Sequence, residues 1–104
     1  MKEKNMNNKP LERVEEILRS LESISRDRYK AEIIGIFGSY VRKEQKKGSD
    51  IDILVKFEKG ATLFDFIGLA DFLEQNLKIK VDIVPVDTIR KEIKEQVLKE
   101  AIYL

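Results

Sequence analysis

The spacing of hydrophobic residues predicts a helix near the start of the chain. Pro10 fits the first turn of this helix, where its missing N–H group costs nothing. The apolar positions that follow recur three or four residues apart, so they share one helical face. They are Leu11, Val14, Ile17, Leu18, Leu21 and Ile24.

Three shorter apolar runs have the lengths and residue types of strands. Residues 31–37 are rich in Ile and end at Gly38, as is typical of a buried strand. Residues 50–57 alternate between two faces, and residues 79–84 form a third run that Pro85 stops. The alternating run places Ile51, Ile53 and Val55 on one face and Asp50, Asp52 and Leu54 on the other.

Three more helices are predicted between and after these strands. A short helix covers residues 39–44, and a long one covers residues 62–77, with Thr62 as its cap and Asp65 in a box-like position. The long helix is apolar almost all round, so we expect the sheet and the first helix, or a partner, to cover it. A last helix starts near residue 88, and its apolar side consists of Ile89, Ile93, Val97, Ala101 and Ile102.

The order of these elements predicts an α/β (α+β) fold with a small mixed β-sheet flanked by helices. A chain of 104 residues allows one domain, which we expect over residues 10–104 after a flexible polar leader over residues 1–9. No apolar run approaches the roughly 18 residues that span a bilayer, and the leader lacks the apolar core of a secretory signal. We therefore expect a cytoplasmic protein without a membrane partner.

Charge and composition limit which ligands the chain can bind and which catalytic groups it can use. The 20 Lys and Arg residues nearly balance the 19 Asp and Glu residues, so stable nucleic-acid binding is not expected. The sequence contains neither Cys nor His, which excludes thiol chemistry and the commonest metal ligand. Any metal site must then be built from oxygen ligands, which favours Mg²⁺ over zinc.

A possible phosphate site lies at the junction between the end of the first strand and the start of the short helix. Gly38 would let the backbone approach a triphosphate closely, and the hydroxyl of Ser39 could add a hydrogen bond. An ordinary strand-to-helix turn would have the same two residues, so the pair alone is weak evidence. Arg42 either reaches the triphosphate with its planar guanidinium or is a solvated charge on the helix.

Aspartates on two strands form the second candidate feature. Asp50 and Asp52 share one face of an Ile-rich strand, about 7 Å apart along the chain, although Asp is depleted in strands. A polar strand face that meets water is the alternative explanation. Asp82 lies in another apolar strand, and if the two strands are neighbours, three carboxylates converge and require a cation to offset their repulsion.

This pattern resembles the nucleotidyltransferase superfamily of DNA polymerase beta. Its motif is a hydrophobic residue with Gly-Ser, a spacer of about ten residues, Asp-hydrophobic-Asp-hydrophobic, and a third Asp on a later strand. The chain is most similar to the minimal nucleotidyltransferases, whose Gly-Ser-Tyr-Ala-Arg-Gly-Glu run resembles the segment from Gly38 to Glu44. Lys43 replaces the usual glycine of that run, so we expect the helix to run on or the loop to cover the nucleotide differently.

The resemblance implies a Mg²⁺-dependent nucleotidyltransferase that uses ATP as its substrate. Asp50, Asp52 and Asp82 would be the catalytic and metal-binding residues for two Mg²⁺ ions, and Asp82 would take the acceptor proton. Gly38, Ser39 and Arg42 would bind the nucleotide. The implied reaction is adenylyl transfer to a hydroxyl group.

The resemblance also implies a partner, because minimal nucleotidyltransferases are typically encoded with a HEPN-domain toxin. The expected function is that of an antitoxin that places AMP on a tyrosine of this toxin. Two alternatives stay open: an antitoxin that only masks its toxin, and a transferase for a small molecule of the aminoglycoside type.

Overall fold

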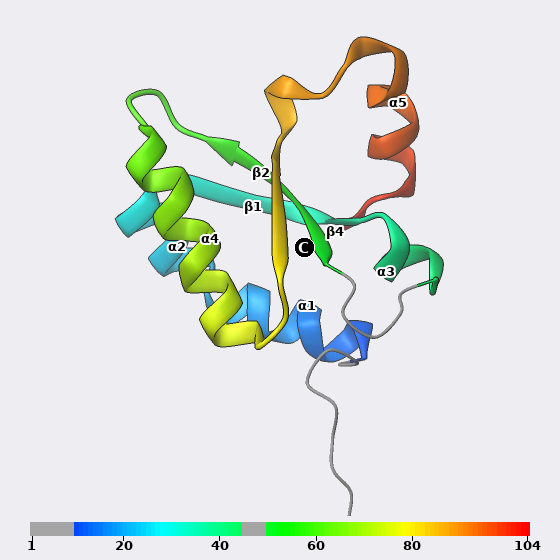
Figure 1. Ribbon diagram of the computed structural model, residues 1–104, viewed down its shortest axis with the longest axis horizontal. Coiled ribbons are helices and arrows are strands. Elements are labelled where there is room, and N and C mark those ends of the chain that lie inside the picture. The colour runs from blue at the N-terminus through cyan, green and yellow to red at the C-terminus, as the bar shows by residue number, and fades with distance from the viewer. Residues whose placement is uncertain (1–9, 45–49) are drawn as a thin grey trace, which may run out of the picture.

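The computed structural model describes residues 10–44 and 50–104, which form a four-stranded mixed sheet with helices packed against it (Figure 1). The predicted leader and the predicted loop at residues 45–49 lie outside the described residues. The chain contains, in order, α1 (Leu11–Ser20), α2 (Glu22–Tyr29), β1 (Ala31–Phe37), α3 (Ser39–Arg42), β2 (Ile51–Phe57), α4 (Leu63–Leu77), β3 (Val81–Pro85), the 3₁₀ helix η2 (Val86–Thr88), α5 (Lys91–Glu100) and β4 (Ile102–Tyr103). This arrangement confirms the predicted fold class.

The strands lie in the order β3-β2-β1-β4. β1 pairs antiparallel with β2 and with β4, whereas β2 and β3 run parallel. The parallel pair needs a crossover, and α4 provides it. Because β3 is an edge strand, Pro85 can end it without removing a hydrogen bond from the middle of the sheet.

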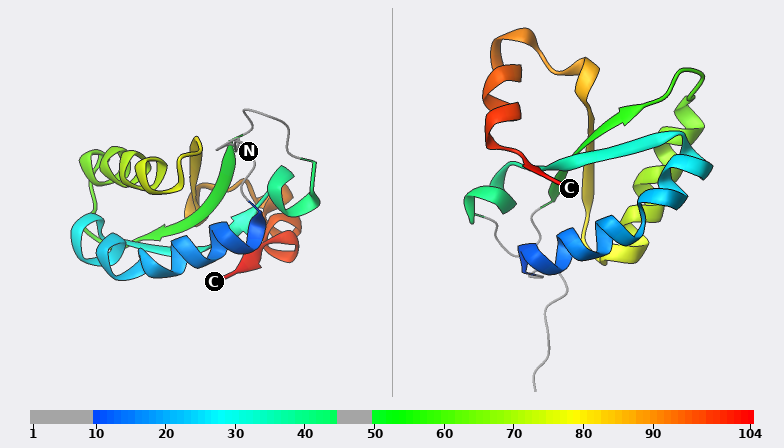
Figure 2. Two further views of the ribbon diagram at one scale, coloured as in Figure 1. Left: turned by 90° about the horizontal axis from the view of Figure 1, so that it is seen from below. Right: turned by 180° about the vertical axis from the view of Figure 1, so that it is seen from behind.

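One face of the sheet holds the main hydrophobic core. The inward positions of β1 and β2 pack against α1 and α4, while α5 lies at the other end of the sheet from α4 (Figures 1 and 2). Leu54 is fully buried although it points to the opposite face from Ile53. The fully buried members of the main core include Val14, Leu18, Ile36, Ile51, Ile53, Val55, Leu69, Leu73 and Leu77.

The predicted first helix is two helices, α1 and α2, which meet at Leu21. The hydroxyl of Ser20 donates to the carbonyl of Ile17 at 2.6 Å, a local hydrogen bond that commonly bends a helix. The N–H of Leu21 is shared between the carbonyls of Ile17 and Leu18, both at 3.1 Å. Ile24, predicted on the buried stripe, is consequently exposed.

The long helix α4 begins as the sequence predicts. Thr62 and Asp65 form a capping box, in which the N–H of Thr62 donates to the carboxylate of Asp65 at 2.8 Å. The helix is covered on only one face, however. Leu63, Phe64 and Ile67 are 70%, 86% and 57% exposed, so the sheet and the first helix do not cover this face, and its cover by a partner stays a prediction.

The prediction of one helix from residue 88 through Ile102 is also wrong. The chain forms η2, then α5, and then β4, which pairs with β1 through Ile102 and Tyr103. A Cβ atom at Gly35 would overlap the carbonyl oxygen of Ile102, so a glycine in β1 allows this close strand pairing. None of the described helices is long and apolar enough to cross a membrane.

Candidate active site

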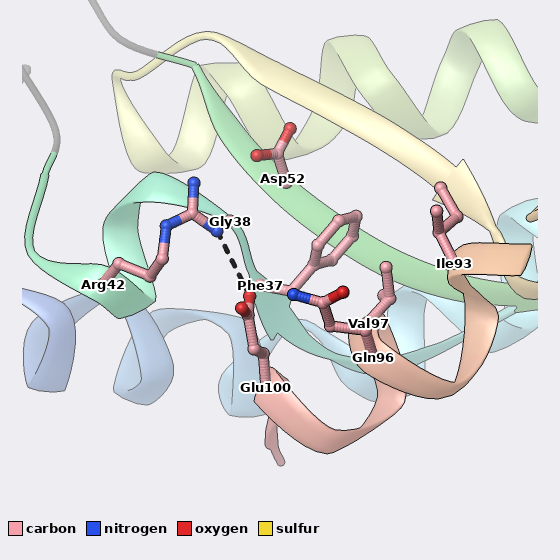
Figure 3. A pocket seen from close by; sticks show the side chains of 8 residues that line it. All are labelled: Phe37, Gly38, Arg42, Asp52, Ile93, Gln96, Val97 and Glu100. Atoms are coloured by element: carbon pink, nitrogen blue, oxygen red, sulfur yellow. Dashed lines mark hydrogen bonds and ion pairs between the residues drawn. The ribbon is translucent and has the colours of Figure 1, made fainter.

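A cleft lies between the sheet and α5, and Asp52 is at its centre. It consists of two adjoining cavities of about 340 and 330 Å³, whose linings share Phe37, Asp52, Ile93 and Val97. The first cavity extends to Gly38, Arg42 and Glu100, as the close view shows (Figure 3). The second extends in the other direction to Asp82, Val84, Thr88, Ile89 and Arg90.

The parallel pairing of β2 with β3 brings two of the predicted aspartates together. Asp52 and Asp82 are register partners, and paired strands are only about 4.8 Å apart. From the sequence, Asp52 and Asp82 were expected to converge only if their two strands were neighbours. The sheet order places β2 and β3 side by side.

This crowding of negative charge changes the acidity of Asp52. Burial, followed by the charge and hydrogen bond of Asp82 and the charge of Asp50, raises the pKa of Asp52 from 3.8 to about 6. The positive charge of Arg42 acts in the opposite direction. Asp52 is therefore a half-buried carboxylate whose ionised form is poorly stabilised by the protein itself.

Asp50 is less closely associated with this pair. It is exposed and comes immediately before β2, and it acts on Asp52 through its charge. Within residues 10–44 and 50–104, no three side chains of the metal-ligating types Asp, Glu, His and Cys are close enough together to form a ready metal site. The fold thus assembles the Asp52–Asp82 pair, with Asp50 beside it.

Gly38 is at the end of β1, directly beside Asp52. Its backbone angles, φ +84° and ψ −151°, belong to a region that is essentially restricted to glycine. A Cβ atom at this position would overlap Oδ2 of Asp52 and lie 3.0 Å from Cγ. The glycine is thus required both by the turn and by the approach of the aspartate.

The other predicted nucleotide ligands come from α3. Arg42 lines the first cavity, and its Nε donates to Glu44 at 3.0 Å while its Nη1 donates to Glu100 at 3.2 Å. The hydrogen bond to Glu44 is the main cause that raises the pKa of Arg42, so the guanidinium stays charged. Ser39 begins α3 next to Gly38, but the described cavity linings do not include it or Asp50.

Lys43 ends α3 in the left-handed conformation, with φ 60° and ψ 35°. The helix therefore does not run on past Arg42, contrary to one of the two expectations for this position. A left-handed residue after a helix is usually glycine, which explains the glycine of the related motif in physical terms.

Sequence reasoning missed the contribution of α5 to the cleft. Ile93 and Val97 were assigned to an apolar helix face, but both line the cavities, and Gln96 and Glu100 extend the wall. The apolar stripe was visible in the sequence, but the surface that it would cover depended on how α5 packs.

A mixed sheet with a Gly-Ser turn next to paired aspartates on adjacent parallel strands defines a nucleotidyltransferase. The chain belongs to this family, since the model of the nucleotidyltransferase domain matches residues 11–104. Within the family it is a minimal nucleotidyltransferase. A solved structure assigned to that group is 40% identical, with a TM-score of 0.70, and covers 89% of this chain and 90% of its own.

Two further relatives have more specific descriptions. The protein adenylyltransferase MntA of Thermococcus cleftensis is 43% identical over 94 residues, which are 90% of this chain and 95% of the relative. A solved structure of a toxin-antitoxin with AMP-PNP is 28% identical, with a TM-score of 0.65, over 86% of this chain and 70% of that one. The chain therefore resembles both a protein-modifying transferase and a member of a toxin–antitoxin pair.

Proposed function

We propose that this chain is an antitoxin that transfers the adenylyl group of ATP to a hydroxyl side chain, a tyrosine, of a HEPN-domain toxin. The observation that carries the proposal is the register pairing of Asp52 with Asp82 in a cleft that also contains Gly38 and Arg42. Folding alone does not favour two carboxylates in such contact, whereas nucleotidyl transfer requires them.

The donor set fits Mg²⁺. Asp50, Asp52 and Asp82 offer only oxygen ligands. Burial and, after it, the neighbouring carboxylates raise the pKa of Asp52, and a hard divalent cation would stabilise its ionised form. We propose that these residues hold two Mg²⁺ ions. When bound, the metal would lower the pKa of the acceptor hydroxyl and offset the negative charge of the phosphates.

The protein's own groups have distinct tasks in this proposal. Gly38 exposes its backbone to the phosphates in the cavity beside Asp52, Ser39 donates a hydrogen bond, and Arg42 binds phosphate oxygens. Asp82, exposed on the edge strand, accepts the proton of the acceptor hydroxyl. The hydroxyl oxygen forms a bond to the α-phosphorus, the bond from that phosphorus to the bridging oxygen breaks, and pyrophosphate leaves.

A protein acceptor is supported by the relatives of the chain and by an exposed apolar surface on α4. The similar chains are a protein adenylyltransferase and a toxin-antitoxin with AMP-PNP. The exposed side chains of Leu63, Phe64 and Ile67 are typical of a surface that contacts another protein.

Pyrophosphate release tests the proposal. The chain is mixed with a purified HEPN-domain toxin, ATP and Mg²⁺, and pyrophosphate is followed with a coupled enzyme assay. We expect release only when toxin, ATP and Mg²⁺ are all present, and none when the acceptor tyrosine of the toxin is replaced by phenylalanine.

Asp52→Asn in the chain is the matched variant, because it keeps the shape of the side chain and removes its charge. It should abolish release while the far-ultraviolet circular dichroism spectrum is unchanged. A tight complex that inhibits the toxin without any pyrophosphate release, and equally well with Asp52→Asn, would instead identify a masking antitoxin.

A further inference from the structure

One ion pair crosses the first cavity of the cleft. Nη1 of Arg42, on α3, donates to Oε1 of Glu100, the last residue of α5, at 3.2 Å. Figure 3 shows the two side chains pointing toward each other from different walls of the cavity, with Asp52 on a third side. The contact joins two helices whose residues are 58 positions apart in the chain.

The position of Glu100 is unexpected for a cavity that is proposed to hold a triphosphate. Its carboxylate lines the same 340 Å³ as Gly38, Arg42 and Asp52, so it adds negative charge where phosphate must enter. A carboxylate and a phosphate present similar oxygen pairs to an arginine, and both bind its planar fork of N–H groups. Glu100 therefore occupies a donor of Arg42 that a phosphate could use.

The ion pair is weak enough for a phosphate to replace Glu100 as the acceptor of Arg42. The side chains of Arg42 and Glu100 are 45% and 31% exposed, and a single pair of atoms, Nη1 and Oε1, is in contact. Exposed pairs of this kind contribute little to stability, whereas a phosphate offers more charge and several oxygens. Nε of Arg42 also donates to Glu44 at 3.0 Å, and this hydrogen bond does not involve Nη1, the atom that contacts Glu100.

We infer that Glu100 competes with the nucleotide for Arg42: it pairs with the guanidinium at the cavity and is displaced from it by a phosphate of the incoming nucleotide. This inference rests on the proposed function, because it takes ATP as the ligand of the first cavity. It adds a residue of α5 to the predicted site residues, none of which lies on that helix.

Calorimetric titration with ATP in the presence of Mg²⁺ tests the inference. Glu100→Gln removes the competing charge, so we expect its dissociation constant to fall about two- to five-fold, the range for an exposed ion pair. Glu95→Gln is the matched control, since it makes the same change at an exposed position of the same helix, and it should bind like the wild type. Adenosine, which has no phosphate, should show no difference between wild type and Glu100→Gln.

A double-mutant cycle distinguishes the displacement of Glu100 from Arg42 from a direct charge repulsion between Glu100 and the phosphates. Arg42→Ala should weaken ATP binding by about ten-fold or more, because it removes a charged hydrogen-bond donor. In that background Glu100→Gln should have no further effect, since the pair that it releases is already gone. A simple repulsion between Glu100 and phosphate would persist in the Arg42→Ala background.

The outcomes distinguish the inference from the proposed function. If wild type binds ATP and Glu100→Gln binds it equally or more weakly, the inference is overturned and the proposed function stands. An unchanged benefit of Glu100→Gln in the Arg42→Ala background also overturns the inference. If wild type does not bind ATP at all, the proposed function fails, and the inference fails with it.

Discussion

Burial, and after it the neighbouring carboxyl group of Asp82, raises the pKa of the half-buried Asp52 to about 6. The folded state therefore holds a proton at Asp52 more tightly than the unfolded chain does. The contribution of this group to stability is greatest below about pH 4, falls as the pH rises to about 6, and is unfavourable above that.

Asp52→Asn should therefore stabilise the fold at neutral pH in the absence of divalent cations. A shift of about two pKa units, reduced for solvent screening of a half-exposed group, predicts a gain of about 1–2 kcal/mol. Urea unfolding at several pH values in the presence of a chelator measures it, with Asp27→Asn, an exposed carboxyl on α2, as the control. The gain should disappear towards pH 4, and a gain that is constant over the pH range would contradict this explanation.

Gly38 gives the second prediction at the scale of single residues. In Gly38→Ala the new methyl group overlaps Oδ2 of Asp52 and the backbone is strained, so we expect loss of ATP binding and of about 1–3 kcal/mol of stability. Gly60→Ala is a matched control, because Gly60 has φ +95° but its Cβ would approach only the amine of Lys30, at 3.9 Å. Calorimetry should show normal ATP affinity for Gly60→Ala; equal losses in the two variants would indicate that strain alone is responsible.

The site residues stay a prediction, but the structure shows which of them lie together. The sequence favoured Gly38, Asp52 and Asp82 because aspartate is depleted in strands and the motif resembles a known family, and the strand pairing brings these three side by side, with Asp50 less closely associated. Glu100 was not selected, because it resembles any solvated helix charge. Its position opposite Arg42 depends on how α5 packs, which no local pattern encodes.

At the scale of elements, the sequence predicted helices and strands correctly where a few neighbouring residues determine the local structure. The first strand, 31–37, and the start of α4 at its capping box both match the sequence prediction. The pattern failed at the join of α1 and α2 and at β4, because a shared hydrogen bond and a pairing with a distant strand decide those positions. The apolar stripe that continued into Ile102 had the period of a helix, but Ile102 pairs instead with Ile36 of β1.

The end of α3 gives a prediction for an element boundary. Lys43 has a left-handed conformation that costs a non-glycine residue roughly 1 kcal/mol or more. Lys43→Gly removes this cost but gives the unfolded chain more freedom, so we expect a net gain of about 0.5–1 kcal/mol in the free energy of unfolding. Chemical denaturation measures the gain; Lys43→Ala, which keeps a Cβ atom, should show none, and a destabilised Lys43→Gly would contradict the account.

At the scale of the whole molecule, the sheet order determines what the chain can do. β2 lies between β1 and β3, so the end of β1 with Gly38 and the edge strand with Asp82 both lie next to Asp52. α5 then closes the other side of the cleft (Figure 3). The sequence predicted a mixed sheet, but the neighbours of each strand come from long-range pairing.

Intact-mass spectrometry of the partner toxin tests the central claim that this cleft performs adenylyl transfer. After incubation of the toxin with the chain, ATP and Mg²⁺, the toxin should gain mass in steps of one adenylyl group. A chelator, or Asp52→Asn in the chain, should prevent the gain, because the charge of the phosphates and the acidity of the acceptor would no longer be controlled. A toxin that is fully inhibited but unchanged in mass would contradict the account.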